Sequence, residues 1–159
     1  MKMNFPDILT EKNKVMKKIV FLAAMVLTVP ALYAQEAPEK VIEKFFQDYQ
    51  KGDPAQALDN LYRHMPWSDR IRDELDKMRS QFTGLQSLVG KYYGYDFVVK
   101  KELAGSFSVY SYLARFERQP VRFIFKFYKP QDQWFLYGFS YDDDFSQEIE
   151  EAVKVYNLK

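Results

Sequence analysis

Apolar residues follow two different periods along the chain, and the period changes at Gly90. Before Gly90 they recur three, four or seven residues apart, which places them on one face of a helix. After Gly90 they alternate with polar residues, which is typical of strands with one buried face. This order predicts an α+β fold in which three N-terminal helices pack on a curved four-stranded antiparallel meander sheet, with a C-terminal helix.

Each of the three expected N-terminal helices has its own apolar stripe. The first ends at Gly52, and the second begins at Asp53-Pro54, because Asp caps a helix and Pro suits its first turn. The third follows Ser68 or Asp69, either of which can cap it, and has the clearest periodicity. The stripes are Val41, Ile42, Phe45, Phe46 and Tyr49; Ala57, Leu58 and Leu61; and Ile71, Leu75, Met78, Phe82 and Leu85.

Four strands are predicted after Gly90, at residues 91–103, 107–118, 121–129 and 134–142. Their connections are short, so neighbouring strands are expected to pair antiparallel. A last helix is expected at about residues 145–156, with Ile149, Val153 and Tyr156 together on one side. The third strand is expected to turn one face to the core, with the side chains of Val121, Phe123, Phe125 and Phe127.

The N-terminal region has the pattern of a secretory signal peptide at residues 16–34. A basic start at Met16 precedes an apolar run at 19–29, and Pro30 breaks this run before the small residue Ala34. Cleavage is expected between Ala34 and Gln35. The run is shorter than the roughly 20 apolar residues of a spanning helix, which disfavours an uncleaved membrane anchor.

The other boundaries follow from this signal. Residues 1–15 are polar and aperiodic, so we expect a non-native or dispensable extension, with translation starting at Met16. Residues 35–38 are expected to be a linker, and residues 39–159 a single domain, because a segment of this length has room for one core.

Charge and composition exclude several classes of protein. The residues after Ala34 carry slightly more acidic than basic side chains, whereas a nucleic-acid-binding protein needs a basic surface. The chain has no cysteine, which excludes disulfides, thiolate metal sites and a lipid-modified cysteine anchor. It has one histidine, so we expect neither a metal nor a cofactor.

Two short motifs resemble the nuclear transport factor 2-like, cystatin-like superfamily: the turn Lys51-Gly52-Asp53 and the strand Trp134-Phe135-Leu136-Tyr137-Gly138-Phe139. The resemblance spans residues 39–144. It implies a sheet that wraps around the helices as a cone, which in this superfamily holds a ligand, an active site or only side chains. Many members have a strand or hairpin between the second and third helices, yet only residues 64–67 lie there, so an unrelated helical hairpin packed on a sheet stays open.

The leader ending Leu32-Tyr33-Ala34-Gln35 resembles those of Bacteroidetes-type Gram-negative bacteria. This resemblance implies the periplasm or the extracellular space of such a bacterium. Cleavage would leave the domain with no stable membrane anchor.

His64 and Asp96 are the weak catalytic candidates. An imidazole acting as a general base needs an orienting carboxylate, from Asp59 or Asp69, and a surface histidine is the favoured alternative. Asp96 lies between Tyr95 and Phe97, and a carboxylate buried among aromatic rings would have a raised pKa, as the resemblance to ketosteroid isomerase-like members implies. Strand alternation, however, exposes Asp96 if its two neighbours face the core.

A pocket for a small amphipathic ligand is the main binding hypothesis, because aromatic side chains combine apolar bodies with polar tips. Core packing, together with a self-associating outer face of the sheet, is the favoured alternative. The expected ligand-binding residues are Trp67, Tyr93, Tyr112, Phe125 and Trp134.

Two charged clusters have structural interpretations that we favour. Asp142-Asp143-Asp144 could attract calcium, but consecutive carboxylates on an extended chain point to opposite sides, and Asp144 suits a helix N-terminus. The basic cluster could hold an anionic partner or protect the sheet from aggregation. It consists of Arg115, Arg118, Arg122 and Lys126.

The sequence therefore predicts an exported, non-enzymatic domain that binds a small amphipathic ligand or a protein partner. The alternative is an isomerase, dehydratase or hydrolase with an acid–base residue inside the cone. A homodimer formed through the sheet face is compatible with either.

Overall fold

The computed structural model of the protein describes residues 36–156. The predicted extension at 1–15, the signal peptide at 16–34 and the cleavage between Ala34 and Gln35 lie outside the described residues. Within the described range, no helix is long and apolar enough to cross a membrane.

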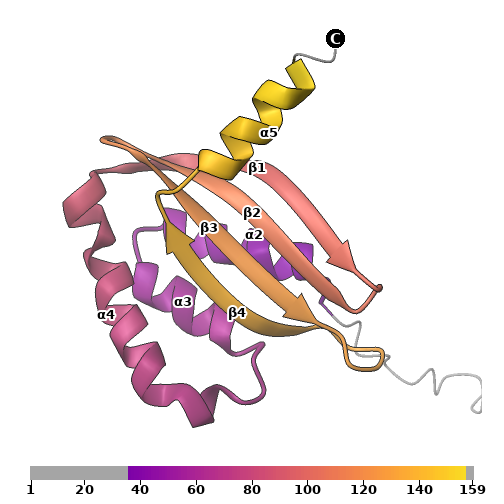
Figure 1. Ribbon diagram of the computed structural model, residues 1–159. Helices are drawn as coiled ribbons and strands as arrows, with labels where there is room; N and C mark the ends of the chain where they lie inside the picture. The colour runs from indigo at the N-terminus through magenta and orange to yellow at the C-terminus, as the bar shows by residue number, and fades with distance from the viewer. Residues whose placement is uncertain (1–35, 157–159) are drawn as a thin grey trace, which may run out of the picture. The chain divides into compact units, whose positions relative to one another are not determined.

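The described residues form an α+β fold with four helices and one four-stranded sheet (Figure 1). All neighbouring strands pair antiparallel in the order β1-β2-β3-β4, which confirms the predicted class and sheet. The elements are α2 (Pro38–Gln50), α3 (Pro54–Tyr62), the 3-10 helix η1 (Ser68–Ile71), α4 (Arg72–Val89), β1 (Tyr92–Leu103), β2 (Phe107–Phe116), β3 (Pro120–Tyr128), β4 (Phe135–Asp142) and α5 (Ser146–Tyr156).

Local chemistry explains where the helices begin and end. Asp53 caps α3, because its side chain accepts a hydrogen bond from the backbone N–H of Gln56 at 2.8 Å. At the end of α4, Gly90 has a φ of +87°, and a Cβ there would lie 2.8 Å from the Cβ of Glu117. Only glycine fits this junction, where the chain leaves α4 and enters the sheet.

Strand β2 ends two residues earlier than the sequence indicates. The backbone N–H groups of Glu117 and Arg118 donate to the carbonyls of Lys91 and Val89, at 2.9 and 3.0 Å. These two residues therefore fasten the β2–β3 turn to the α4–β1 junction. Strand β1 is interrupted by two register shifts, at Tyr92/Gly94 and Phe97/Val99.

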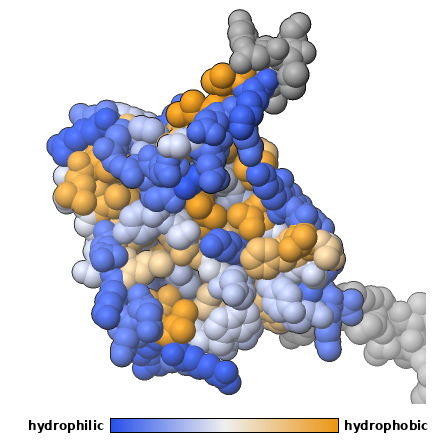
Figure 2. Space-filling model, in the orientation of Figure 1, coloured by the Kyte–Doolittle hydropathy of each residue, from blue (hydrophilic) through white to orange (hydrophobic). Residues whose placement is uncertain are grey.

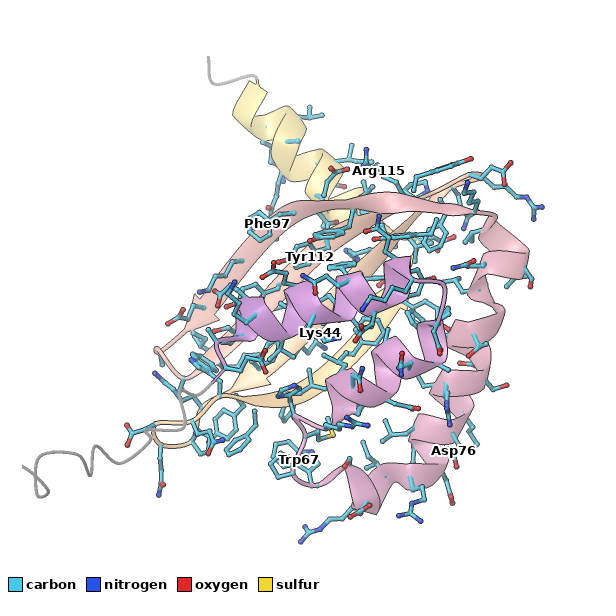
Figure 3. All side chains as sticks on the ribbon, turned by 180° about the vertical axis from the view of Figure 1, so that it is seen from behind. Lys44, Trp67, Asp76, Phe97, Tyr112 and Arg115 are labelled. Atoms are coloured by element: carbon cyan, nitrogen blue, oxygen red, sulfur yellow. The ribbon has the colours of Figure 1, made fainter. Side chains whose placement is uncertain are left out.

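The core lies between one face of the sheet and the helices α2, α3 and α4. Figure 1 shows α2 and α3 behind the sheet and α4 beside it, and Figure 3 shows α2 and α3 in front of the sheet. The ring of Phe45 lies at its centre, 5.1 Å from Phe125, 5.3 Å from Phe139 and 6.0 Å from Phe82. The predicted core face of β3 is confirmed, since its four alternating apolar residues are buried.

Helices α2 and α3 are joined by a buried carboxylate. Asp48 is only 3% exposed in its side chain, yet it accepts hydrogen bonds from Lys44, from Lys51 at 3.2 Å and from Asn60 at 2.9 Å. The hydrogen bond from Lys44 is the main reason that the pKa of Asp48 is lowered to about 2. The carboxylate therefore stays ionised and connects α2 to Asn60 of α3.

Helix α5 begins over the face of the sheet opposite to the other helices. Its anchor is Arg122 of β3, whose guanidinium pairs with Asp142 at 2.9 Å and with Glu148 at 2.8 Å. A second pair, between Lys101 and Glu151, is longer, at 3.6 Å, and more exposed. The partly buried Arg122 cluster therefore holds the first turn of α5.

Replacing Asp48 with Asn should lower the free energy of unfolding at pH 7 by about 2 kcal/mol, because the depressed pKa measures how strongly the folded state favours the carboxylate. A carboxyl group whose pKa is lowered by folding stabilises the folded state at pH values above its ordinary pKa. This contribution is lost as the pH falls from about 4 to 2. Urea titrations of D48N and the unmodified protein should therefore converge in that interval.

Asp76 of α4, an exposed aspartate, provides the control for this variant. D76N should leave the urea midpoint unchanged at pH 7. A constant difference between D48N and the unmodified protein from pH 7 to pH 2 would contradict the assigned role of Asp48.

Replacing Glu148 with Gln should loosen α5 without unfolding the sheet, because it removes one anion from the Arg122 cluster. Hydrogen exchange followed by mass spectrometry should show α5 amides exchanging several times faster, with β2 and β3 unchanged. E151Q is the matched control, since its exposed pair contributes little. Equal exchange in both variants would show that Arg122 does not anchor the helix.

Candidate functional site

His64 lies in the connection between α3 and η1, and it is about one-third exposed. Neither of the expected orienting carboxylates reaches it: Asp59 pairs with Arg79 at 2.9 Å and Asp69 with Arg72 at 3.1 Å. The nearest acidic group is Glu36, at 3.9 Å from Nε2. The backbone carbonyl of His64 accepts a hydrogen bond from Leu136, which ties this connection to β4.

Asp96 lies on the exposed face of β1. Its carboxylate is 59% exposed and pairs with Nε of Arg115 at 3.2 Å. Its neighbours Tyr95 and Phe97 lie on the opposite face of β1 and pair with Ala114 and Tyr112 of β2. Side-chain alternation along the strand predicted this arrangement for an exposed Asp96. A solvated, ion-paired carboxylate does not have the surroundings of a buried base.

The five aromatic residues expected to bind a ligand lie in three different places. Phe125 and Tyr112 are buried in the core, whereas Tyr93 is 57% exposed at the start of β1. The ring of Trp67 lies 6.5 Å from that of Phe135, the first residue of β4, and Trp134 immediately precedes this strand. Figure 3 shows Trp67 separated from Tyr112 by α2 and α3. These residues therefore do not line one common pocket.

Two depressions flank Tyr93. One, of about 200 Å³, has Tyr49, Gln86 and Tyr92 in its lining, and the other, of about 480 Å³, follows the turn at residues 115–120. Burial raises the pKa of Tyr49 to about 12 and raises that of Tyr92 as well. Both phenols are therefore held in the neutral form more strongly than a solvated tyrosine.

A polar cluster at the start of α2 connects the helix to the sheet. The hydroxyl of Tyr110 donates to Glu39 at 2.7 Å, and the ammonium of Lys100 lies 3.1 Å from the same oxygen. Burial opposes ionisation of Glu39, but the hydrogen bonds from Tyr110 and Lys100 outweigh it and lower its pKa. Burial raises the pKa of Tyr110 to about 12. This ion pair holds α2 against β1 and β2.

The charged clusters are mostly engaged within the chain. Asp144 accepts from the backbone N–H of Ser146 at 2.9 Å at the start of α5, and Asp142 pairs with Arg122. Arg118 donates to the carbonyls of Ser87 and Leu88 at the end of α4. Among residues 36–156, no group of three or more acidic or histidine side chains is placed to hold a metal ion.

The face of the sheet turned away from α2, α3 and α4 carries apolar side chains together with charged ones, such as the pair of Arg122 and Asp142. In Figure 2, hydrophobic residues appear below α5 in several places, with polar residues between them. Leu103 is 70% exposed and Tyr137 is 53% exposed, and the ring of Tyr137 lies 5.5 Å from that of Phe107. Strand register places the following residues together on the part of this face that we call the open sheet face: Leu103, Phe107, Val109, Ile124, Lys126, Tyr128, Tyr137 and Gly138.

Helix α5 borders the open sheet face and carries an apolar stripe of its own. Glu148 and Glu151 point to Arg122 and Lys101 of the sheet. Ile149 and Val153 are 62% and 54% exposed, so this side of α5 is not covered by the sheet. Two neighbouring apolar surfaces are therefore exposed.

The sequence predicted a self-associating outer sheet face but not its individual residues. A signal is present in β2 and β3, where positions that alternate away from the core are themselves apolar, as Val109 and Ile124 show. A solvated face would carry polar residues at these positions. Apolar residues on both faces of a strand thus indicate a second contact surface.

No protein-family model, no curated protein and no solved structure matches this chain. The relation to the nuclear transport factor 2-like superfamily therefore stays a prediction.

Proposed function

We propose that the protein is an exported, non-enzymatic binding domain whose open sheet face docks another protein. The observation that carries the proposal is that apolar side chains on one face of the sheet are exposed on β1, β3 and β4 and half-buried on β2 between them, next to the exposed stripe of α5. Contiguous exposed apolar patches on small domains mark interaction sites.

The packed interior supports a docking role over a ligand inside the cone. Rings from the helices and the sheet meet at 5 to 6 Å throughout the core, for example Phe45 with Phe125 and Phe82 with Phe123. A small molecule would have to displace these rings, at a large cost in packing.

The acid–base groups support a non-enzymatic role. Asp48 is the buried carboxylate among residues 36–156, and its hydrogen bonds hold it ionised with a pKa of about 2, far below that of a useful base. The side chain of His64 is about one-third exposed, and that of Asp96 is 59% exposed and paired with Arg115. An enzyme with its base inside the cone is therefore less well supported.

A photo-crosslinking amino acid in place of Tyr137 should form a discrete adduct with a protein in the native host. Tyr93 is the matched control, because it is also a tyrosine of similar exposure but lies beside the two depressions. The yield from position 137 should exceed that from position 93 at least fivefold. Adducts from position 93 alone would favour the depressions, and no adduct from position 137 would overturn the proposal.

Export predicts a processed N-terminus. Mass spectrometry of the protein from its host should detect a chain that begins at Gln35, because cleavage is expected after Ala34. The unprocessed form should begin at Met16. Peptides from residues 4–14 in the cellular protein would contradict the predicted start, and an intact segment 16–34 would contradict cleavage.

A further inference from the structure

We infer that α5 is a releasable strap: it closes over β2 at Ser111, is held there by ion pairs, and lifts from the sheet when these pairs are weakened. The inference goes beyond the proposed function, because it concerns the motion of the helix and holds whether or not the sheet docks a protein. If the outer face does dock a protein, release of α5 enlarges the surface that is offered.

Two ion pairs define where α5 crosses the outer face of the sheet. The first turn of α5 is held at Arg122 of β3, through Glu148 at 2.8 Å. The second turn is held at Lys101 of β1, through Glu151 at 3.6 Å. Strand β2 lies between β1 and β3, so the helix spans β2, and Figure 1 shows the first turn of α5 in front of the strands.

Strand register places Ser111 beneath this crossing. Arg122 pairs with Leu113 of β2, and Lys101 pairs with Val109 of the same strand. Ser111 lies midway between Leu113 and Val109 and points to the same face. It is only 6% exposed, whereas Leu113 and Val109 are half-buried. A helix that crosses the face at this point accounts for the deeper burial of Ser111.

The closed position of α5 carries a cost at Ser111. The hydroxyl of this residue is buried and has no hydrogen-bond partner among residues 36–156. A buried hydroxyl without a partner is unfavourable, whereas water satisfies the same group when it is exposed. Lifting α5 lets water reach this hydroxyl. The closed position therefore contains a contribution that favours opening.

Apolar contacts do little to hold the strap closed. Among residues 146–154 of α5, Glu148 is half-buried and the other side chains are exposed, with Ile149 at 62% and Val153 at 54%. Burial of apolar area, which fastens the other three helices, is therefore small for α5. What remains are the ion pairs, and salt weakens ion pairs that water can reach.

The anchor at Arg122 allows α5 to leave without stranding a charge. The Nε and Nη2 atoms of Arg122 donate to Asp142 at 2.9 and 3.0 Å, and Nη1 donates to Glu148 at 2.8 Å. Asp142 belongs to β4 and stays in place when the helix lifts. The guanidinium thus keeps one carboxylate partner in both positions, which lowers the cost of release. Residues 143–145, between β4 and α5, are the hinge.

Raising the ionic strength should open the strap. In the full chain, the amides of α5 should exchange with deuterium at least about threefold faster in 1 M NaCl than in 0.1 M NaCl, because the Debye length falls from about 10 Å to 3 Å. Amides of β2 and β3 report global unfolding and should exchange at the same rate in both. Exchange in α5 that does not respond to salt would overturn the inference.

Replacing Ser111 with Ala should close the strap, because alanine removes the unpartnered hydroxyl. Exchange of the α5 amides in 0.1 M NaCl should slow at least about fivefold. Ser108→Ala is the matched control, since Ser108 is also buried in β2 with an unpartnered hydroxyl, but on the core face. S108A should leave α5 exchange unchanged. Equal effects of the two variants on α5, or no effect of S111A, would contradict the strap.

A distance measurement checks that α5 moves as a unit. The chain has no cysteine, so Gln133→Cys and Lys154→Cys can carry one spin label each, at exposed positions on the β3–β4 connection and on α5. The distribution of distances should gain a second population in 1 M NaCl, and S111A should reduce that population. One unchanged distance under all conditions would show that the helix is fixed.

This inference and the proposed function fail separately. A fixed α5, together with an adduct from position 137, would overturn the strap and keep the docking surface. A mobile α5 without an adduct from position 137 would keep the strap and overturn the docking surface. Where both hold, the yield of the adduct should change with S111A, because the variant alters how much of the face is uncovered.

Discussion

The fold depends on one constraint, which is that aromatic rings from α2 must fit against alternating aromatic rings of β3 and β4. Phe45 contacts Phe123, Phe125 and Phe139, and Phe46 stacks on Tyr95 at 3.7 Å. The chain has no cysteine, so no disulfide assists this packing. Ring burial, at roughly 150–250 Å² for each ring, therefore provides most of the stabilisation. It also explains why side chains from the helices and the sheet fill the interior.

The sequence predicted the fold well because each element has a strong local signal. The Asp53-Pro54 start, the Gly90 junction and the period of two in β3 all act within a few residues, and the structure agrees with each. The end of β2 was misplaced by two residues because Glu117 and Arg118 bond to a distant segment. Long-range contacts of this kind leave no periodic trace.

The candidate site was harder to predict, because residues with side chains suited to a common site do not necessarily lie close together in the folded chain. Trp67 and Tyr93 have the same aromatic character, but strand direction puts them at opposite ends of the sheet. Asp96 could be interpreted only after its face was known, because one register shift would reverse it. Asp48 attracts no attention in the sequence, yet its buried position follows from the α2–α3 turn and its contact with Asn60.

The two register shifts of β1 have a consequence for how the protein associates. Strand β1 is an edge of the sheet, and a long, regular edge would invite further strands to add without limit. The bulges between Tyr92 and Gly94 and between Phe97 and Val99 make the row of free backbone groups irregular, and Lys100 and Lys101 add charge to this edge strand. Growth by strand addition is thereby discouraged. The irregular edge thus counteracts polymerisation into a fibre, although the sheet exposes apolar side chains on its outer face.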